Sequence, residues 1–336
     1  MDLTIAEVDP LDPTNEPLLH AMYDVSAAAR AERPFEVWAP WPTTYQTWTH
    51  PSPEEQADVL WVAREGEQVV GMTSLSLPLL DNQHTAHATL FVHPDQQRRG
   101  IGTHLLDTVV EHARRSGRSV LMTSPCSPVG GAGRGEAFLT ARGFELGIAE
   151  VQQVCDLDES EPTWRALAAQ AAAHHADYRL EPWRERVPER LVEGYCQMGE
   201  AFNHEVPLGE LEIEPEVWSA ERVRSRDDRF VATGRHQFGV LAYADDGTCV
   251  GITELFVNEA ASWRALQGGT LVVPGHRGHH LGLALKAANL RAVRERFPGC
   301  RYVFTAVAGV NAPMNAVNDA LGFRSVERLL EMQLRL

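Results

Sequence analysis

Two short segments place glycine beside arginine or histidine at matching spacing, and both suit the binding of a phosphate group. The first reads Gln97-Arg98-Arg99-Gly100-Ile101-Gly102-Thr103 and the second Arg277-Gly278-His279-His280-Leu281-Gly282. An apolar pattern of helical spacing follows each, so each is expected to lead into a helix N-terminus, whose unpaired N–H groups and partial positive charge attract anions. Glycine lets phosphate oxygens approach the backbone, and arginine adds charge and donors. We name residues 97–103 the first cradle and residues 277–282 the second cradle.

The two cradles belong to an internal repeat. Pro94 and Pro274, which are expected to end the preceding strands, stand 180 positions apart. A Gly-Phe pair at 143–144 recurs at 322–323, at a spacing of 179. Such paired landmarks indicate two copies of one domain rather than two unrelated strand–turn–helix segments. We therefore predict a first domain at 1–157, a linker helix at 158–177 and a second domain at 178–336.

Strand and helix patterns follow the same order in both copies, and each copy is expected to end in a hairpin. The Pro- and Trp-rich stretch 33–53 is expected to be a loop. This order predicts an α+β fold with a mixed, mostly antiparallel sheet flanked by helices, whereas a Rossmann domain alternates strand and helix from the start. The expected strands lie at 3–8, 59–64, 69–77, 86–92, 119–123, 178–181, 238–244, 248–257, 269–273 and 301–305, and the closing hairpins at 144–157 and 323–334.

Charge and cysteine usage exclude several functional classes. The 336 residues carry a formal net charge of −16, which argues against nucleic acid or an anionic membrane as a partner and is compatible with a cationic amine substrate. The five cysteines form no Cys-x-x-Cys pair, and the spacing of His84, His87 and His93 fits no common zinc pattern, so neither a disulfide framework nor a metal site is expected. The N-terminus has no signal-peptide pattern, and no apolar run approaches the ~20 residues of a membrane helix. We therefore expect a cytoplasmic protein.

The first cradle resembles the Gln/Arg-x-x-Gly-x-Gly/Ala signature of the GNAT superfamily of N-acetyltransferases, and the second matches it except at His280, where the first glycine is usual. The segment 311–323 is similar to the C-terminal half of tandem acetyltransferases of actinobacteria, of which mycothiol synthase is a distantly related two-domain example. The resemblance implies two tandem GNAT domains that bind acetyl-CoA, with its pyrophosphate in the cradle. It also implies that the preceding strand pairs its backbone with the pantetheine arm. The residues implied in this strand contact are Leu90, Phe91, Val92, Val272 and Val273.

Acetyl transfer to an amine needs a base that takes a proton from the nitrogen. Glu254, on an expected strand before the second cradle, is the leading candidate, and His276 lies beside that cradle. The first copy offers His84 and His87. The structural alternatives are a salt-bridged strand carboxylate and polar residues at a strand end.

In many GNAT enzymes a tyrosine four residues before the Gly-Phe pair protonates the departing thiolate. This chain has Leu139 and Asn318 at those positions, so the usual acid is absent, although a CoA thiol is a good leaving group. Asn318 can still donate a hydrogen bond, and Asn311 is expected near the emerging thioester, with helix capping as its structural alternative. The second copy is therefore the better candidate for catalysis.

These observations predict an acetyl-CoA-dependent N-acetyltransferase that acts on a primary amine of a small molecule by direct transfer in a ternary complex. No cysteine lies in a recognisable nucleophile motif, which argues against a covalent enzyme intermediate. The alternative is a non-catalytic acyl-CoA sensor or scaffold with one or both halves inactive. A monomer or homodimer is expected, with no nucleic acid, membrane or metal partner. The aromatic residues that could line a substrate groove or pack beneath a loop are Trp38, Trp41, Tyr45 and Trp48.

Overall fold

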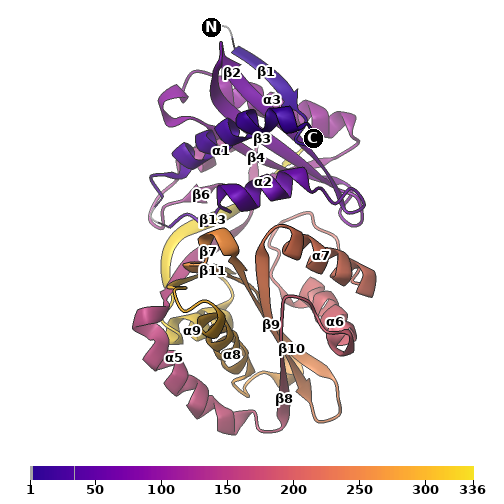
Figure 1. Ribbon diagram of the computed structural model, residues 1–336, viewed down its shortest axis with the longest axis vertical. Helices are drawn as coiled ribbons and strands as arrows, with labels where there is room; N and C mark the ends of the chain where they lie inside the picture. Colours follow the sequence, from indigo (N-terminus) through magenta and orange to yellow (C-terminus); the bar gives the residue numbers. More distant parts are fainter. Residues whose placement is uncertain (1–2, 34) are drawn as a thin grey trace. The chain divides into compact units, whose positions relative to one another are not determined.

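A computed structural model describes residues 3–33 and 35–336 of the chain (Figure 1). Contacts within the chain define two compact units. The first unit comprises Met1–Ile148, Leu208–Glu214 and Leu329–Leu336, and the second unit Ala149–Pro207 and Pro215–Arg328. The two units are interleaved along the sequence, because each takes in part of the last strand of the other copy. The two units group residues by their contacts and not by the sequence repeat, so the boundaries predicted for the two copies stay a prediction.

The first unit contains a sheet in the strand order β1-β2-β3-β4-β5-β13. Neighbouring strands are antiparallel, except that β4 and β5 are parallel. A two-residue strand, β6 (Cys126–Ser127), pairs with β13 outside this order. The sheet strands are β1 (Leu3–Val8), β2 (Gln56–Glu65), β3 (Gln68–Pro78), β4 (Thr85–Val92), β5 (Val120–Thr123) and β13 (Arg324–Arg335).

Apolar side chains leave both faces of this sheet, and helices cover each face. In β4, Phe91 packs against a cluster that includes residues of α1 (Glu16–Arg30) and α2 (Trp41–Thr49). Its neighbours Leu90 and Val92 pack instead with Ile101 and Leu105 of α3 (Ile101–Arg115). Successive side chains of a strand point to opposite faces, so the cradle helix α3 lies on the face opposite α1. A short helix, α4 (Arg134–Thr140), follows β6.

The second unit repeats this plan with the strand order β7-β12-β11-β10-β9-β8. Its one parallel pair is β11 and β12 among the strand pairs that the structure describes in this unit, which matches β4 and β5. The strands are β7 (Glu145–Asp156), β8 (Tyr178–Arg184), β9 (Arg235–Ala244), β10 (Cys249–Asn258), β11 (Arg264–Val272) and β12 (Tyr302–Ala308).

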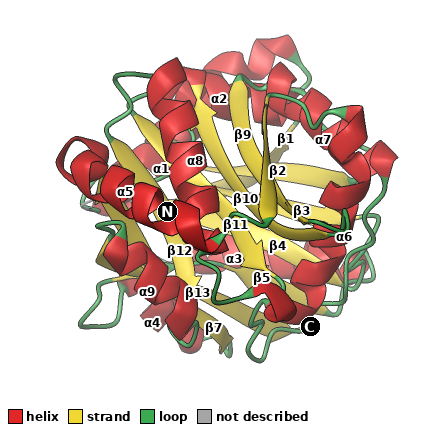
Figure 2. Cartoon of the chain, turned by 90° about the horizontal axis from the view of Figure 1, so that it is seen from below, coloured by secondary structure: helices red, strands yellow, loops and turns green. Residues whose placement is uncertain are grey.

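Helices also cover both faces of the second sheet. Figure 1 shows α6 (Glu189–Glu205) and α7 (Ala220–Ala232) on one side of β9 and β10, and α8 (Leu281–Arg296) on the other. Leu241 of β9 packs with the α6 cluster, whereas its neighbour Val240 packs with Leu281 and Leu285 of α8. In Figure 2, α5 (Leu157–Ala171) lies beside α8, which it contacts. The last helix, α9 (Ala312–Ala320), precedes β13.

The final strand of each copy completes the sheet of the other unit. In β7, residues 150–156 pair antiparallel with β12, from Glu150 opposite Ala308 to Asp156 opposite Tyr302. In β13, residues 332–335 pair antiparallel with β5. The hairpin predicted at the end of each copy is therefore wrong. Each copy ends in a single long strand, because the second part of that strand finds its backbone partners in the other copy's sheet.

The stretch predicted as a loop at 33–53 contains helix α2, so that prediction is also wrong. Pro42 lies in the first turn, where proline's missing N–H costs no helical hydrogen bond. Trp41, Tyr45 and Trp48 pack on the first unit's core cluster, and this tertiary burial offsets the poor helix propensity of a Trp- and Thr-rich sequence. Within the segment predicted as a linker helix at 158–177, α5 ends at Ala171 and a 3-10 turn follows at Ala172–His174. Trp164 of α5 is buried in the core of the second unit.

Candidate active site

The two cradles share one backbone conformation although their glycines stand at different positions. In the first cradle the left-handed residues are Arg98 (φ 65°) and Gly100 (φ 87°). In the second cradle they are Gly278 (φ 89°) and His280 (φ 55°), at the same positions relative to the following helix. Each cradle thus has one non-glycine residue in a conformation that favours glycine. The departure at His280 changes the residue without changing the path of the chain.

Both cradles end in a helix N-terminus with free backbone donors. The N–H groups of Gly100, Ile101 and Gly102 make no backbone hydrogen bond within the part of the chain that the structure describes, and the same holds for 280–282. A Cβ added at Gly282 would meet no atom within 4 Å. Free N–H groups at a helix start beside an unobstructed glycine fit a phosphate group. The residues at both cradles therefore fit the pyrophosphate of acetyl-CoA.

Side chains brace the cradles in equivalent ways. Gln97 donates through Nε2 to the carbonyl oxygen of Val92 (3.4 Å), and Arg277 donates through Nε to that of Val272 (3.0 Å). Arg277 is also paired with Glu205 (2.6 Å). In the first cradle Arg99 is paired with Glu65, whereas Arg98 makes no ion pair with the residues that the structure describes. The first residue of the signature thus supports the loop, and we expect Arg98 to be the cation that acts on a ligand.

The backbone of His280 lies in the left-handed region, so we expect its replacement by glycine to stabilise the protein. His280→Gly is expected to raise the free energy of unfolding by about 0.5–1 kcal/mol, because glycine adopts positive φ without the Cβ clash. Urea unfolding of both proteins at one pH measures this difference. Gly278→Ala is the matched control and is expected to lower stability. A loss of stability in His280→Gly would mean that the ring contact with His174, with centroids 4.5 Å apart, outweighs the strain.

The strand before each cradle has an open edge. The parallel pairing of β4 with β5 covers 85–87 alone, and that of β11 with β12 covers 264–266 alone, among the described residues. Beyond these residues the strands diverge. Leu90, Phe91 and Val92 lie on the open part of β4 and Val272 on that of β11, where an extended ligand can add main-chain hydrogen bonds. Val273 lies one residue beyond β11, and its N–H donates to the carbonyl of Val250 on the neighbouring strand.

A carboxylate in either cradle is expected to block acetyl-CoA. We predict that Gly102→Glu weakens binding at the first cradle, and Gly282→Glu at the second, by about tenfold or more, since like charges repel in a site built for an anion. Calorimetric titration measures the affinity and the number of sites. The alanine variants serve as controls of fit, because a Cβ at Gly102 approaches Phe138 no closer than 3.4 Å. Two unchanged sites in the Gly102→Glu/Gly282→Glu double variant would refute the cradle assignment.

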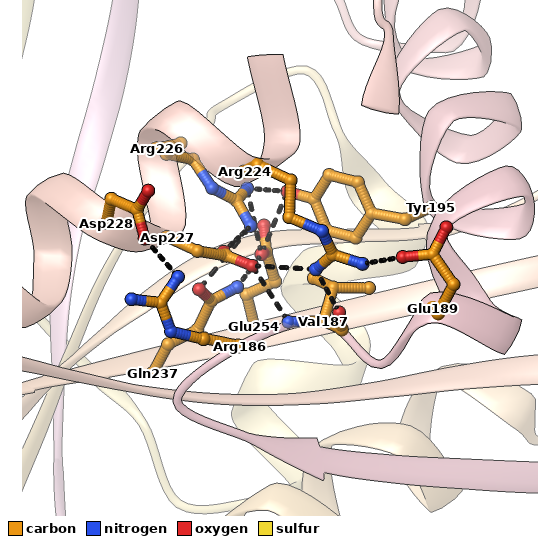
Figure 3. Close-up of polar contacts among 10 residues, drawn as sticks. All are labelled: Arg186, Val187, Glu189, Tyr195, Arg224, Arg226, Asp227, Asp228, Gln237 and Glu254. Carbon is orange, nitrogen blue, oxygen red and sulfur yellow. Dashed lines mark hydrogen bonds and ion pairs between the residues drawn. The ribbon is translucent and has the colours of Figure 1, made fainter. Parts of the chain in front are cut away.

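Glu254 lies at the centre of a buried polar network in the second unit (Figure 3). Its Oε1 accepts hydrogen bonds from Gln237 Nε2 (2.7 Å) and the Tyr195 hydroxyl (3.0 Å), and Arg226 Nη1 lies 3.4 Å away. Arg226 also donates to the Tyr195 hydroxyl. The residue is 8% exposed, and burial raises the pKa of its carboxyl, while Arg226 opposes this shift.

The two oxygens of Glu254 have different surroundings. All the donors above act on Oε1, whereas Oε2 accepts no hydrogen bond from the residues that the structure describes. Oε2 is not fully buried, so it keeps some accessible surface. One oxygen therefore fixes the carboxylate while the other stays available. This geometry suits proton transfer from a group that approaches Oε2.

A β-bulge lies opposite Glu254. The pairing of β10 with β11 shifts between Thr253 and Leu255, so Glu254 faces two residues, Gly268 and Gly269. A Cβ on Gly269 would lie 2.5 Å from the ring of Phe202, and one on Gly268 2.7 Å from that of Phe256. A side chain at either position would therefore require the neighbouring aromatic ring to move. The bulge locally opens β11 beside the carboxylate.

The partners of Glu254 carry no sequence motif, and sequence reasoning missed them. Tyr195 comes from α6, Arg226 from α7 and Gln237 from β9. The neighbouring Asp227 is fully buried, and its Oδ2 accepts the backbone N–H of Val187 (2.9 Å). Figure 3 shows how these side chains converge from three elements. Only the packing of α6 and α7 on the sheet brings them together.

The two candidate asparagines have structural partners in the second unit. Asn311 is the N-cap of α9, with Oδ1 accepting from the Met314 N–H (3.3 Å). Asn318 is fully buried, accepts from Lys286 Nζ (2.6 Å) and donates to Gln153 Oε1 (2.8 Å). Their catalytic roles stay a prediction. Sequence reasoning did not find Lys286, which sits in the apolar stripe of α8.

The candidate histidines make no hydrogen bond with Glu254 among the described residues. His84 Nε2 lies 3.0 Å from the carbonyl of Glu212, and His87 Nε2 lies 3.3 Å from Thr85 Oγ1. His93 accepts through Nδ1 from the Asp95 N–H. His276 Nδ1 is 3.0 Å from the Tyr178 hydroxyl. Over residues 3–33 and 35–336, no three His, Cys, Asp or Glu side chains are grouped so as to hold a metal ion.

The aromatic residues of 38–48 contribute to packing. Trp38 meets Phe91 edge to face with ring centroids 5.5 Å apart, and Arg30 lies over the Trp38 ring. Trp41 contacts both Tyr45 and Trp48. This arrangement agrees with the packing alternative for these side chains.

Comparison with known proteins identifies the family. The sequence profile of the acetyltransferase (GNAT) family matches the chain twice, at residues 22–126 and 204–323. The chain belongs to the GNAT acetyltransferase family. It is an N-acetyltransferase with two tandem GNAT domains, and the predicted α+β fold and enzyme class are confirmed.

Three individual proteins illustrate the likeness. A tandem GNAT protein from the clavulanic acid biosynthesis pathway is 30% identical and superposes with a TM-score of 0.82 over 99% of this chain and 98% of its own. The mycothiol acetyltransferase of Saccharomonospora viridis is 31% identical over 247 residues, which are 71% of each chain. A GCN5-related N-acetyltransferase from Sphaerobacter thermophilus, 18% identical, has the same fold with a TM-score of 0.67 over 99% of this chain and 95% of its own. Within the described residues, no helix of this GNAT protein is long and apolar enough to span a membrane.

Proposed function

We propose that the second unit transfers the acetyl group of acetyl-CoA to a primary amine of a small molecule, by direct attack in a ternary complex. The observation that carries this proposal is the carboxylate of Glu254, held by donors on Oε1 and accessible at Oε2 beside the open strand β11. When bound, acetyl-CoA supplies the acyl thioester. The second cradle would hold its pyrophosphate, and the open part of β11 its extended arm.

Glu254 is the proposed base. An amine nitrogen that attacks the thioester carbonyl forms a C–N bond, the C–S bond breaks, and the proton lost by the nitrogen passes to Glu254 Oε2. The thiolate takes a proton from solvent. A raised carboxyl pKa brings the base closer to neutral pH than an ordinary glutamate, which favours proton transfer from an ammonium or amine. The net charge of −16 also favours a cationic substrate.

The cysteines support direct transfer over a covalent acyl-enzyme. Cys155, Cys249 and Cys300 are buried, and burial raises the pKa of their thiols to about 11, 11 and 12. The thiolate is the nucleophilic form of cysteine, so these groups are poor nucleophiles at neutral pH. None of the five cysteines, all within the described residues, forms a disulfide, which is consistent with the reducing cytoplasm that we propose as the compartment.

The first unit is better suited to binding than to catalysis. Gly71 of β3 corresponds to Gly251 of β10, and Ser74 then stands where the second unit has Glu254. The first cradle keeps its free N–H groups. We propose that this unit binds acetyl-CoA without transferring the acetyl group. The sensor alternative likewise has at least one half without catalytic activity.

Two measurements test this function. Titration with acetyl-CoA gives the number of binding sites, and release of free thiol is then followed with a panel of primary amines. Initial rates at several concentrations of both substrates should give intersecting double-reciprocal lines, as a ternary complex requires. Parallel lines would refute direct transfer. Binding without thiol release for any amine would favour a non-catalytic acyl-CoA sensor in both halves.

A further inference from the structure

A chain of polar side chains, of which Lys286, Asn318 and Gln153 are buried and Asn315 is half-buried, crosses the second unit from α8 to the turn after β12. It begins at Lys286, which is 2% exposed and whose Nζ donates to Asn318 Oδ1 (2.6 Å). Asn318 Nδ2 donates to Gln153 Oε1 (2.8 Å), and Gln153 Nε2 donates to Asn315 Oδ1 (3.2 Å). Asn315 Nδ2 reaches the carbonyl oxygens of Asn311 (3.0 Å) and Ala308 (3.4 Å).

The direction of this chain is set at its buried end. A protonated lysine can only donate, so the amide oxygen of Asn318 must face it and the amide NH₂ must face Gln153. Gln153 and Asn315 have the same arrangement: the amide oxygen of each accepts from the residue before it, and the NH₂ group donates to the next acceptor. The chain ends on two carbonyls at residues 308 and 311, in the turn that joins β12 to α9. Lys286 is thereby connected through hydrogen bonds to a turn at the open end of β12.

The fold does not require these polar residues, as the first unit demonstrates. Lys286 and Asn318 correspond in the repeat to Leu106 and Leu139, and Gln153 to Met332. The strand pairing agrees, because Gln153 lies opposite Thr305 of β12 as Met332 lies opposite Thr123 of β5. All six residues are buried. The three positions are apolar together in one unit and polar together in the other.

Burying an amine and two carboxamides costs free energy that an apolar trio avoids. Burial lowers the pKa of Lys286 to about 7, which is the expected sign for an ammonium removed from water. The Nζ also lies 5.3 Å from the ring centroid of Phe323. The cost is present only in the unit that has Glu254. A role in that unit's chemistry accounts for the polar trio and for its occurrence in the same unit as Glu254.

We propose that Lys286 is a positioning residue for acyl transfer in the second unit, acting through Asn318 and Gln153 on the turn at 308–311. The inference rests on the function proposed above. The turn carries the N-cap Asn311 and follows residues 305–308 of β12, which line the opening beside β11. Holding this turn in one arrangement keeps the opening shaped for the thioester and the amine.

The decisive variant transplants the apolar trio of the first unit: Lys286→Leu/Asn318→Leu/Gln153→Met. We expect kcat to fall at least tenfold, the acetyl-CoA Kd of the second cradle to stay within threefold, and the thermal midpoint to equal or exceed that of the wild type. The pH profile of kcat should also lose an inflection near the pKa of Lys286. A kcat within twofold of wild type would overturn the proposal, and so would a kcat loss that merely accompanies a lower thermal midpoint.

Two further variants separate positioning from general disturbance of the core. Asn318→Asp keeps an acceptor for Lys286 but removes the donor to Gln153, so kcat should fall without loss of stability. Ser160→Ala alters a buried hydroxyl 3.1 Å from Cys155 Sγ in the same core but outside the chain, and should leave kcat unchanged. An equal kcat loss in Ser160→Ala would overturn the proposal. If the wild type itself releases no thiol with any amine, the proposed function fails and takes this inference with it, whereas full turnover by both wild type and trio variant removes the inference alone.

Discussion

Replacing Glu254 with glutamine is expected to lower kcat by about 10²–10⁴-fold, the usual range for loss of a general base. Glutamine has nearly the same shape and keeps an oxygen to accept from Tyr195 and Gln237, so the network should persist. Because the second cradle does not involve this side chain, the acetyl-CoA Kd should stay unchanged. Single-turnover thiol release and calorimetry measure the two quantities separately.

The pH profile gives this prediction a second readout. Only the ionised carboxylate accepts a proton, so activity rises with pH as Glu254 loses its own. Burial raises the pKa of Glu254, and the rising limb should therefore lie above the ordinary carboxyl range. Glu254→Gln should abolish that limb, and Ser74→Ala at the equivalent position of the first unit should leave it in place. Normal turnover in Glu254→Gln would transfer the role of base to another group.

The apolar trio variant Lys286→Leu/Asn318→Leu/Gln153→Met is expected to be more stable than the wild type by about 1–4 kcal/mol at pH 6, the range seen when buried charges give way to packed apolar side chains. The gain should shrink as pH rises. Chemical unfolding at a series of pH values measures it, with Ser160→Ala as a control that should show no pH-dependent difference. A gain that is constant from pH 6 to pH 10 would refute the assignment of a buried, titrating lysine.

The sign of this pH dependence follows from proton linkage. The pKa of lysine is ordinarily 10.5, and that of buried Lys286 is lowered to about 7. Between these values the unfolded chain holds a proton that the folded protein has released, so the wild type's free energy of unfolding rises with pH across this window. Below about pH 7 both states hold the proton and the penalty is complete. The variant lacks the group, so its advantage is largest there.

The cradles could be predicted from sequence because their chemistry is local. Positive φ at two positions, a helix start and free N–H groups all lie within residues 97–103 or 277–282, and glycine, arginine and the apolar stripe encode them directly. The repeat spacing then indicated two copies. The substitution of histidine at 280 did not mislead, because the backbone adopts the same conformation with a small cost in strain.

The surroundings of Glu254 and Lys286 could not be predicted in this way. The donors to Glu254 come from α6, α7 and β9, and no spacing in the sequence relates Tyr195, Arg226 and Gln237 to one another. A lysine within an apolar helix stripe is usually an exposed edge residue, and only tertiary packing buries Lys286. Contacts between side chains far apart in sequence depend on how the elements pack.

By itself, then, the sequence determined the repeated α+β plan, the place and glycine-rich chemistry of the two cradle loops, and the family, because these depend on periodicity, turn chemistry and short motifs. The tertiary structure decided three further features. Helix α2 forms in a Trp- and Pro-rich stretch, and β7 and β13 each complete the sheet of the other copy. The second unit has a carboxylate network at Glu254 and a lysine-headed chain of carboxamides. The physical reason is that burial and strand pairing are set by partners distant in sequence, whereas each cradle is formed by residues that are consecutive in the sequence.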